Sequence, residues 1–237
     1  MTISERMADI KPVRLSLDSK FKFKCHSGVK CFTKCCRDIN IALTPYDIIR
    51  LKNRLQLSSD EFLAMYTVPR LLEKTDLPMV TLRMMDDDLK SCPFVTDNGC
   101  IIYEDRPTTC RYYPLGVASL SHREGVDDEG FYFFVHESHC LGFEEKKEWT
   151  VREWRKDQGV DIHDEINAGW TDLVSYNIDK FKQFVFESSF LNRYHIDNAT
   201  VEKIREDEIA LLEFGLKWLK DVLYKEGSSK VKESETD

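Results

Sequence analysis

The stretch CHSGVKCFTKCC, residues 25–36, decides the fold, because it places four cysteines in the spacing C-x5-C-x3-C-C. A second cysteine-rich stretch, CPFVTDNGCIIYEDRPTTCRYYP, covers residues 92–114. Its spacing is C-x7-C-x9-C, and a fourth cysteine follows at a distance. The eight cysteines of the chain are Cys25, Cys31, Cys35, Cys36, Cys92, Cys100, Cys110 and Cys140. Thiols at such short intervals form disulfides or bind metal.

The rest of the sequence favours metal. A chain of 237 residues buries a core without the help of disulfides. Residues 1–20 carry charges throughout and lack the apolar region of a secretory signal. No apolar run approaches the roughly 20 residues of a membrane span. We therefore expect a cytoplasmic protein whose thiols stay reduced, which favours metal binding over structural free thiols and over disulfides.

The charge of the chain limits its partners. The net charge is −8 and the pI is about 5.4, whereas binding to nucleic acid needs a clustered basic face. Arg50, Lys52 and Arg54 are expected on the solvated face of one helix. We expect neither nucleic acid nor membrane as a partner. A protein redox partner or a protein substrate is expected instead.

Composition predicts four segments. Residues 1–20 form an N-terminal arm, and residues 21–145 form a cysteine-cluster domain that holds every cysteine. Residues 146–226 lack cysteine and proline and show helical spacing, and residues 227–237 have the composition of a disordered tail. The predicted fold class is α+β: a small, irregular, cysteine-rich metal-binding domain followed by a C-terminal helical segment.

Local signals predict where several elements begin. Thr44-Pro45 and the capping boxes Ser58-x-x-Glu61 and Thr150-x-x-Glu153 predict helix starts. Alternating or apolar stretches predict strands at residues 21–24, 39–43, 80–84 and 131–135. Helical spacing predicts a helix that contains residues 181–186 and a long amphipathic helix over residues 201–222.

A thiolate-rich site selects zinc or an iron–sulfur cluster. Zinc modules usually show C-x2-C pairs, and this chain has none. Iron–sulfur clusters accept wider spacings and often have a Cys-Pro dipeptide, as at Cys92-Pro93. An iron–sulfur cluster, of the [4Fe–4S] type, is therefore favoured over zinc, and eight cysteines suffice for one or two clusters. In extended backbone, Cys35 and Cys36 would point to opposite faces, so either the pair serves two centres or one of them ligates while the other packs as a buried free thiol.

Charged neighbours of the cysteines have two interpretations. Arg106 and Arg111 either donate hydrogen bonds to thiolates, tuning the metal site, or pair with carboxylates such as Glu104 and Asp105. His26 and His139 adjoin Cys25 and Cys140, and either could replace a thiolate ligand. The commoner role of a histidine in such a place is beside the ligands or toward solvent.

At these residues the sequence resembles the YkgJ-type cysteine-cluster family, a zinc- or iron-chelating domain whose namesake pattern is C-x-x-C-x-x-C-C. The resemblance covers about residues 21–145 and rests on the two cysteine stretches and on Thr44-Pro45-x-Asp47-Ile48. The gaps of the first stretch are longer here than in the namesake pattern. The resemblance implies that seven cysteines are metal ligands or their neighbours: Cys25, Cys31, Cys35, Cys36, Cys92, Cys100 and Cys110.

The leading hypothesis is thus a cytoplasmic metal-binding protein with an electron-transfer or oxidoreductase role. Flagellin lysine N-methylases carry the same domain, so a protein lysine N-methylase is an alternative that rests on the resemblance. The chain has no glycine-rich cofactor turn, phosphate-binding loop or nucleophile elbow. A second alternative is a non-enzymatic structural metal module. Whether the protein is an enzyme stays open, and no catalytic residue is assigned.

Overall fold

The computed structural model describes residues 13–71, 78–118, 131–176, 207–210, 212–217 and 219–220. The chain divides into two compact units. The first contains residues 1–69 and 80–163 and with them all eight cysteines, and the second contains residues 70–79 and 164–237. The segment boundaries at residues 20, 145 and 226 come from composition and stay predictions.

Capping boxes begin three helices, as the sequence predicts. These helices are α2 (Pro45–Leu55), α3 (Ser59–Tyr66) and α5 (Val151–Gln158). In each, a hydroxyl accepts the amide of the third helical residue, whose carboxylate accepts the amide of the capping residue in return. Further helices among the described residues are α4 (Thr108–Tyr112), α6 (Val160–Tyr176) and the 3-10 turns η1 (Lys34–Cys36), η2 (Tyr103–Asp105) and η3 (Gly142–Glu144).

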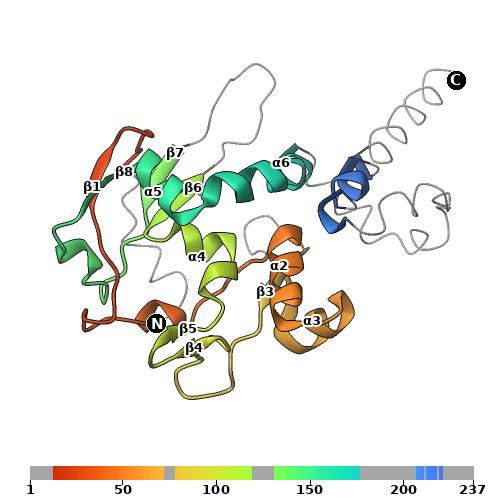
Figure 1. Cartoon of the computed structure of the whole chain (residues 1–237), viewed down its shortest axis with the longest axis horizontal. Helices are drawn as coiled ribbons and strands as arrows, with labels where there is room; N and C mark the ends of the chain where they lie inside the picture. The colour runs from red at the N-terminus through yellow and green to blue at the C-terminus, as the bar shows by residue number, and fades with distance from the viewer. Residues whose placement is uncertain are drawn as a thin grey trace, which may run out of the picture. The chain divides into compact units, whose positions relative to one another are not determined.

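The strands of the described residues pair into four two-stranded sheets. In one sheet β1 (Lys20–Lys22) pairs with β8 (Glu148–Thr150), and in another β4 (Val95–Thr96) pairs with β5 (Gly99–Cys100). The other two pairs are β2 (Thr67–Leu71) with β3 (Pro78–Leu82) and β6 (Leu115–Ala118) with β7 (Phe131–Phe134). Helices and small antiparallel sheets together confirm the predicted α+β class (Figure 1).

The predicted strands are confirmed in part. β1, β3 and β7 lie at three of the predicted stretches, with ends shifted by a few residues. Residues 39–43 run beside β3 without forming a continuous strand, and Ala42 makes an isolated antiparallel β-bridge with Thr81. Arg50 also differs from the prediction, because its guanidinium lies 2.5 Å from the Asp105 carboxylate instead of facing solvent.

Two further predictions fall partly or wholly outside the described residues. The helix around residues 181–186 and the tail at 227–237 lie outside them. Of the long helix predicted over residues 201–222, the described residues 208–210, 212–217 and 219–220 are helical. Among the described residues, no helix is long and apolar enough to cross a membrane.

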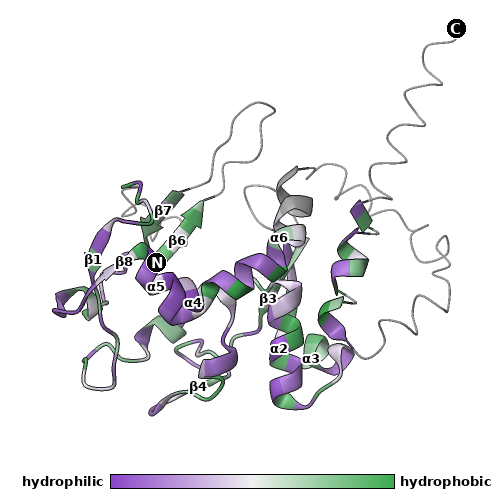
Figure 2. Ribbon diagram, turned by 45° about the horizontal axis from the view of Figure 1, so that its top comes forward, coloured by the Kyte–Doolittle hydropathy of each residue, from purple (hydrophilic) through white to green (hydrophobic). Residues whose placement is uncertain are grey.

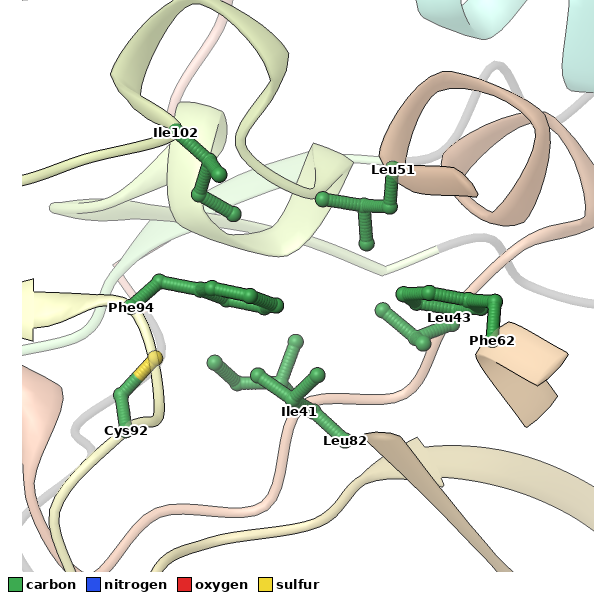
Figure 3. Packing of buried hydrophobic residues seen from close by; sticks show 8 residues of the cluster. All are labelled: Ile41, Leu43, Leu51, Phe62, Leu82, Cys92, Phe94 and Ile102. Atoms are coloured by element: carbon green, nitrogen blue, oxygen red, sulfur yellow. The ribbon is translucent and has the colours of Figure 1, made fainter. Parts of the chain in front are cut away.

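Two hydrophobic clusters form the core of the first unit. The larger one, here the α2 cluster, contains Ile41, Leu43, Leu51, Phe62, Leu82, Cys92, Phe94 and Ile102 (Figure 3). Figure 2 shows green and purple alternating along α2, as expected for a helix with one face on this cluster. The second, here the aromatic cluster, contains Phe21, Phe23, Leu115, Val151 and Trp154. Cysteines border both clusters, so the core also positions the thiols.

Candidate metal centre

The eight cysteines come from six places in the first unit, and all are free thiols. Cys25 and Cys31 lie in the loop after β1, and Cys35 and Cys36 end η1. The other four lie before β4, at the end of β5, in α4 and just before η3: Cys92, Cys100, Cys110 and Cys140. Their positions along the chain do not reveal which of them meet.

Cys25, Cys31 and Cys140 gather where the loop after β1 meets the turn before η3. The Lys24 amide donates to the Gly142 carbonyl at 3.0 Å, and the Leu141 amide donates to the Cys31 sulfur at 3.2 Å. Cys25 is an exposed residue, but partial burial of its thiol, followed by the nearby thiols of Cys35, Cys31 and Cys140, raises its pKa to about 11. We call these three cysteines the Cys140 trio.

Cys92, Cys100 and Cys110 gather around the β4–β5 hairpin. Val95 lies opposite Cys100 in the hairpin, which brings the start of β4 beside the end of β5. Burial, followed by the charges of Cys92 and Cys100, raises the pKa of the Cys110 thiol. Burial also raises the pKa of Cys92, to about 11, and Cys100 contributes to that rise. We call these three cysteines the Cys110 trio.

Cys35 and Cys36 join the two trios. Their sulfur atoms lie 4.0 Å apart, and the Cys92 amide donates to the Cys36 carbonyl at 2.8 Å. A hydrogen bond from Cys36, followed by burial and the charges of Cys36 and Glu137, raises the pKa of Cys35. The pair lies in the 3-10 turn η1, so the expectation of extended backbone with opposed side chains is wrong. A 3-10 turn places consecutive side chains about 120° apart instead of 180°.

Residues in the left-handed region of backbone space flank this turn. Thr33 has φ 67° and Asp38 has φ 48°, and neither is a glycine. Such a conformation costs about 1–3 kcal/mol at a residue with a Cβ, most of all at β-branched Thr33, and persists where surrounding contacts enforce it. Two hydrogen bonds are contacts of this kind: the Cys36 carbonyl accepts the Cys92 amide at 2.8 Å, and the Lys90 carbonyl accepts the Asp38 amide at 3.0 Å. The chain therefore holds the vicinal thiols in a set position.

Backbone amides point at several of the sulfur atoms. The amides of Phe94 and Val95 lower the pKa of Cys92, against the larger effect of burial. The Ile102 amide does the same for Cys100, and the Gly142 amide for Cys140, again against burial. Amide donors stabilise a thiolate over a thiol, and a metal ligand must be a thiolate. The backbone thus favours the ligating form at three sulfurs of the set.

The two arginines of the second stretch bind backbone carbonyls. The Arg111 guanidinium donates to the carbonyls of Glu104, Arg106 and Gln158, the last at 2.9 Å. Arg106 donates to the Tyr103 carbonyl at 2.6 Å and to the Gln158 side chain at 2.5 Å. Neither expected interaction, with thiolates or with the Glu104 and Asp105 carboxylates, is made as a hydrogen bond.

The two arginines differ in their effect on the pKa of a nearby thiol. Burial raises the pKa of Cys100, while the Ile102 amide and the positive charge of Arg106 lower it. Arg111 is instead a clip that joins η2 to α5, since its three acceptors lie in or beside those elements. Of the two, Arg106 is therefore the one whose charge reaches a thiol.

Tyr113 and Glu137 belong to the site although the sequence analysis missed them. Burial, followed by contact with Cys140, raises the pKa of the Tyr113 hydroxyl, and Glu137 and Cys35 add to the rise. The Tyr113 hydroxyl and Oε2 of Glu137 are buried, and neither has a well-aligned hydrogen-bond partner among the described residues. Tyr113 stands in the Cys-Arg-x-Tyr-Pro motif, and this place in a cysteine motif is the sequence signal that could have identified it as a site residue. Glu137 had none beyond its closeness to Cys140 in the chain.

The two histidines beside cysteines have carboxylate neighbours. Nε2 of His26 lies 3.6 Å from the Glu145 carboxylate, and Nε2 of His139 lies 3.3 Å from Glu137. These contacts occupy Nε2 of each ring, and both roles considered for the histidines stay predictions. A carboxylate on one ring nitrogen is compatible with metal binding through the other, and in His26 that other nitrogen, Nδ1, accepts the Gly28 amide at 3.2 Å.

A buried polar network supports α4, the helix that carries Cys110. Oδ1 of Asp47 accepts the Thr108 amide at 2.9 Å and the Thr108 hydroxyl at 2.7 Å, and Nδ1 of His163 lies 2.8 Å from the same hydroxyl. Burial opposes ionisation of Asp47, but hydrogen bonds from His163, Thr44 and Thr108 outweigh it and keep the pKa of Asp47 below its usual range. Asp47, the carboxylate partner in the capping box of α2, thus also fixes the start of α4.

The donor chemistry fits a soft metal. Eight thiols, amides directed at sulfur and the buried hydroxyl of Tyr113 supply a thiolate set with polar support. In the described part of the chain, no three His, Cys, Asp or Glu side chains are gathered as tightly as the ligands of one ion. Ligation therefore requires side-chain rotation that draws neighbouring sulfurs together.

Comparison with known proteins agrees with this chemistry. The family model described as "CxxCxxCC: Putative zinc- or iron-chelating domain" matches residues 24–141. These residues contain all eight cysteines, and the match confirms the resemblance noted in the sequence. No curated protein and no solved structure matches the chain.

Proposed function

The chain belongs to the zinc- or iron-chelating CxxCxxCC family, whose model matches residues 24–141, and we propose that its cysteines bind an iron–sulfur cluster and that the protein transfers electrons. The observation that carries the proposal is the gathering of eight free thiols from distant parts of the chain, with backbone amides directed at sulfur. Hydrogen bonds to sulfur and limited solvent exposure are the means by which proteins tune iron–sulfur reduction potentials.

Three features favour iron–sulfur over zinc. Eight thiols exceed the four that one structural zinc takes. The chain lacks C-x2-C pairs and contains the Cys92-Pro93 dipeptide. Cys92 and Cys31 are also largely buried, at 9% and 8% exposed, which suits a centre shielded from water and oxygen.

In this proposal the eight cysteines are the ligand set, and other side chains support them. Arg106 offsets negative charge near Cys100, and Tyr113 faces Cys140. When bound, an iron–sulfur cluster supplies one-electron redox chemistry. The chain holds the thiols, shields Cys31 and Cys92 from water and directs backbone amides at several sulfurs. A cytoplasmic protein is the expected redox partner, since reduced thiols persist in that compartment.

One observation favours a second candidate, a structural metal module. The thiols border both hydrophobic clusters, with Cys100 and Cys110 against the α2 cluster and Cys140 against the aromatic cluster. A metal bound there would hold the two clusters together, and its binding free energy would add to that of folding. Zinc would suffice for this role, since no electron is transferred.

Metal and sulfide analysis of protein purified without oxygen separates the two candidates. We expect iron and acid-labile sulfide in similar amounts, a brown colour that dithionite bleaches, and an electron paramagnetic resonance signal in one oxidation state. Stoichiometric zinc with neither iron nor sulfide would refute the redox proposal and leave the structural module.

A matched pair of variants shows whether the thiols carry the signal. Cys110→Ser should abolish or alter the absorbance, because it removes a thiolate from α4. Thr109→Ser changes the exposed neighbouring side chain on the same helix and should leave the absorbance unchanged. Equal spectra for the two variants would exclude Cys110 from the ligand set.

A further inference from the structure

The eight thiols are arranged as two sets joined at one point. The Cys110 trio borders the α2 cluster. Cys92 is itself a member of that cluster and lies at the edge of the cluster, beside Phe94 (Figure 3). Cys100, Cys110 and also Cys36 pack against the same cluster. Cys140 packs instead against the aromatic cluster. The hydrophobic core therefore assigns Cys36 and the Cys110 trio to one side and Cys140 to the other.

Hydrogen bonds tie each set together separately. The Cys140 trio is joined by the bond from Leu141 to the Cys31 sulfur and by the Lys24–Gly142 bond beside Cys25. In the Cys110 trio, the β4–β5 register and the bond from the Ile101 amide to the Phe94 carbonyl, at 3.0 Å, join the segments of Cys92 and Cys100, and Cys110 packs against the same α2 cluster. The bond from Cys92 to Cys36 adds Cys36 to that set.

Four thiolates complete one tetrahedral zinc site or hold one [4Fe–4S] cluster. Cys36 completes the Cys110 trio by its contacts, which leaves Cys35 for the Cys140 trio. A single centre of this kind would leave four of the eight thiols without a metal.

We propose that this domain holds two adjacent metal centres, one bound by Cys25, Cys31, Cys35 and Cys140 and the other by Cys36, Cys92, Cys100 and Cys110. The proposal rests on the proposed function in that both require thiolate ligation. It goes further by fixing the number of centres and dividing the ligands. Because Cys35 and Cys36 are consecutive, the two centres are neighbours joined through one peptide bond.

Titration with cobalt(II) counts the centres. Metal-free, reduced protein is titrated without oxygen, and the thiolate-to-cobalt absorbance is followed. We expect saturation at two equivalents per chain. Saturation at one equivalent would overturn the two-centre proposal while leaving metal binding intact, and no thiolate absorbance at all would refute both this proposal and the proposed function.

Paired variants test how the ligands are divided. Cys31→Ser with Cys140→Ser removes two thiolates from one set and should leave one equivalent of bound cobalt. Cys100→Ser with Cys110→Ser should also leave one, from the other set. Cys110→Ser with Cys140→Ser damages both sets and should leave none in the presence of a chelator that removes cobalt from three-thiolate sites.

Controls separate ligand loss from unfolding. Thr109→Ser should retain two equivalents, and far-ultraviolet circular dichroism at the same total cobalt concentration should show each double variant to be as helical as the parent. A folded Cys31/Cys140 variant that binds no cobalt, or a Cys110/Cys140 variant that still binds one tightly, would overturn the division proposed here. The parent titration stands as a test even if one double variant fails to fold.

Discussion

Asp47→Asn tests whether the buried network beneath α4 stabilises the fold through its charge. Asp47 has no exposed surface, and its two oxygens accept the amides of Thr44 and Thr108 and the Thr108 hydroxyl. Asparagine has nearly the same shape but only one acceptor oxygen, so its NH2 group must face a donor. At least one hydrogen bond to a charged group is lost and one buried donor is left unsatisfied.

The expected loss of stability follows from these contacts. A hydrogen bond to a charged group contributes about 1.5–3 kcal/mol, and an unsatisfied buried donor costs a further 1–3 kcal/mol. We therefore expect Asp47→Asn to lower the free energy of unfolding by about 3 kcal/mol. For a unit of this size that corresponds to a fall in Tm of roughly 6–12 °C.

Urea unfolding, followed by tryptophan fluorescence at equal metal content, is the assay. Asp97→Asn is the matched control, since Asp97 is exposed in the β4–β5 turn, and its effect should stay within about 0.5 kcal/mol. A free energy of unfolding for Asp47→Asn within about 1 kcal/mol of the parent value would refute the reasoning, because the loss of charge at a buried carboxylate with three donors should cost more than that.

The pH dependence gives a second measurement on the same residue. The folded state lowers the pKa of Asp47, so the stability it contributes is present above the ordinary carboxyl pKa of the unfolded chain. That stability is lost as the pH falls below this value and through the lowered folded pKa. The parent should therefore lose more stability than Asp47→Asn on acidification below about pH 4. Parallel pH profiles would contradict the prediction.

Three further changes test other contacts of the first unit. Arg111→Ala removes three hydrogen bonds to carbonyls and should cost about 2–4 kcal/mol in urea unfolding, whereas Arg152→Ala, an exposed partner of Asp18, should cost under about 1 kcal/mol; equal effects would contradict the clip. Gly142→Ala would place a methyl group 2.6 Å from the buried Phe23 ring and should cost about 1–3 kcal/mol, while Gly215→Ala, where nothing lies within 4 Å, should be neutral or stabilising in the same assay. Chelation of the bound metal should lower the melting temperature, and an unchanged melting curve after verified removal would contradict a role for metal in holding the thiol loops.

The sequence alone predicted the features that depend on nearby residues. The starts of α2, α3 and α5 were predictable because a capping box joins residues only three positions apart. The α+β class was predictable from helical spacing and short alternating stretches. The inventory of thiols and the cysteine-cluster family likewise follow from residue identity, which folding does not change.

Tertiary structure decided which of those residues meet. The hydrogen bonds of Asp47 with Thr108, the bond of Arg111 to the Gln158 carbonyl and the place of Glu137 near Cys35 all join segments separated by tens of residues. Such contacts depend on the path of the whole chain, which spacing does not encode. The 3-10 turn at Cys35 and Cys36 is a local feature, but contacts with distant Ser91 and Cys92 hold its end. The sequence thus determined the chemistry of the ligands, while folding determined their neighbours, because thiols far apart in the chain meet only where the core brings their segments together.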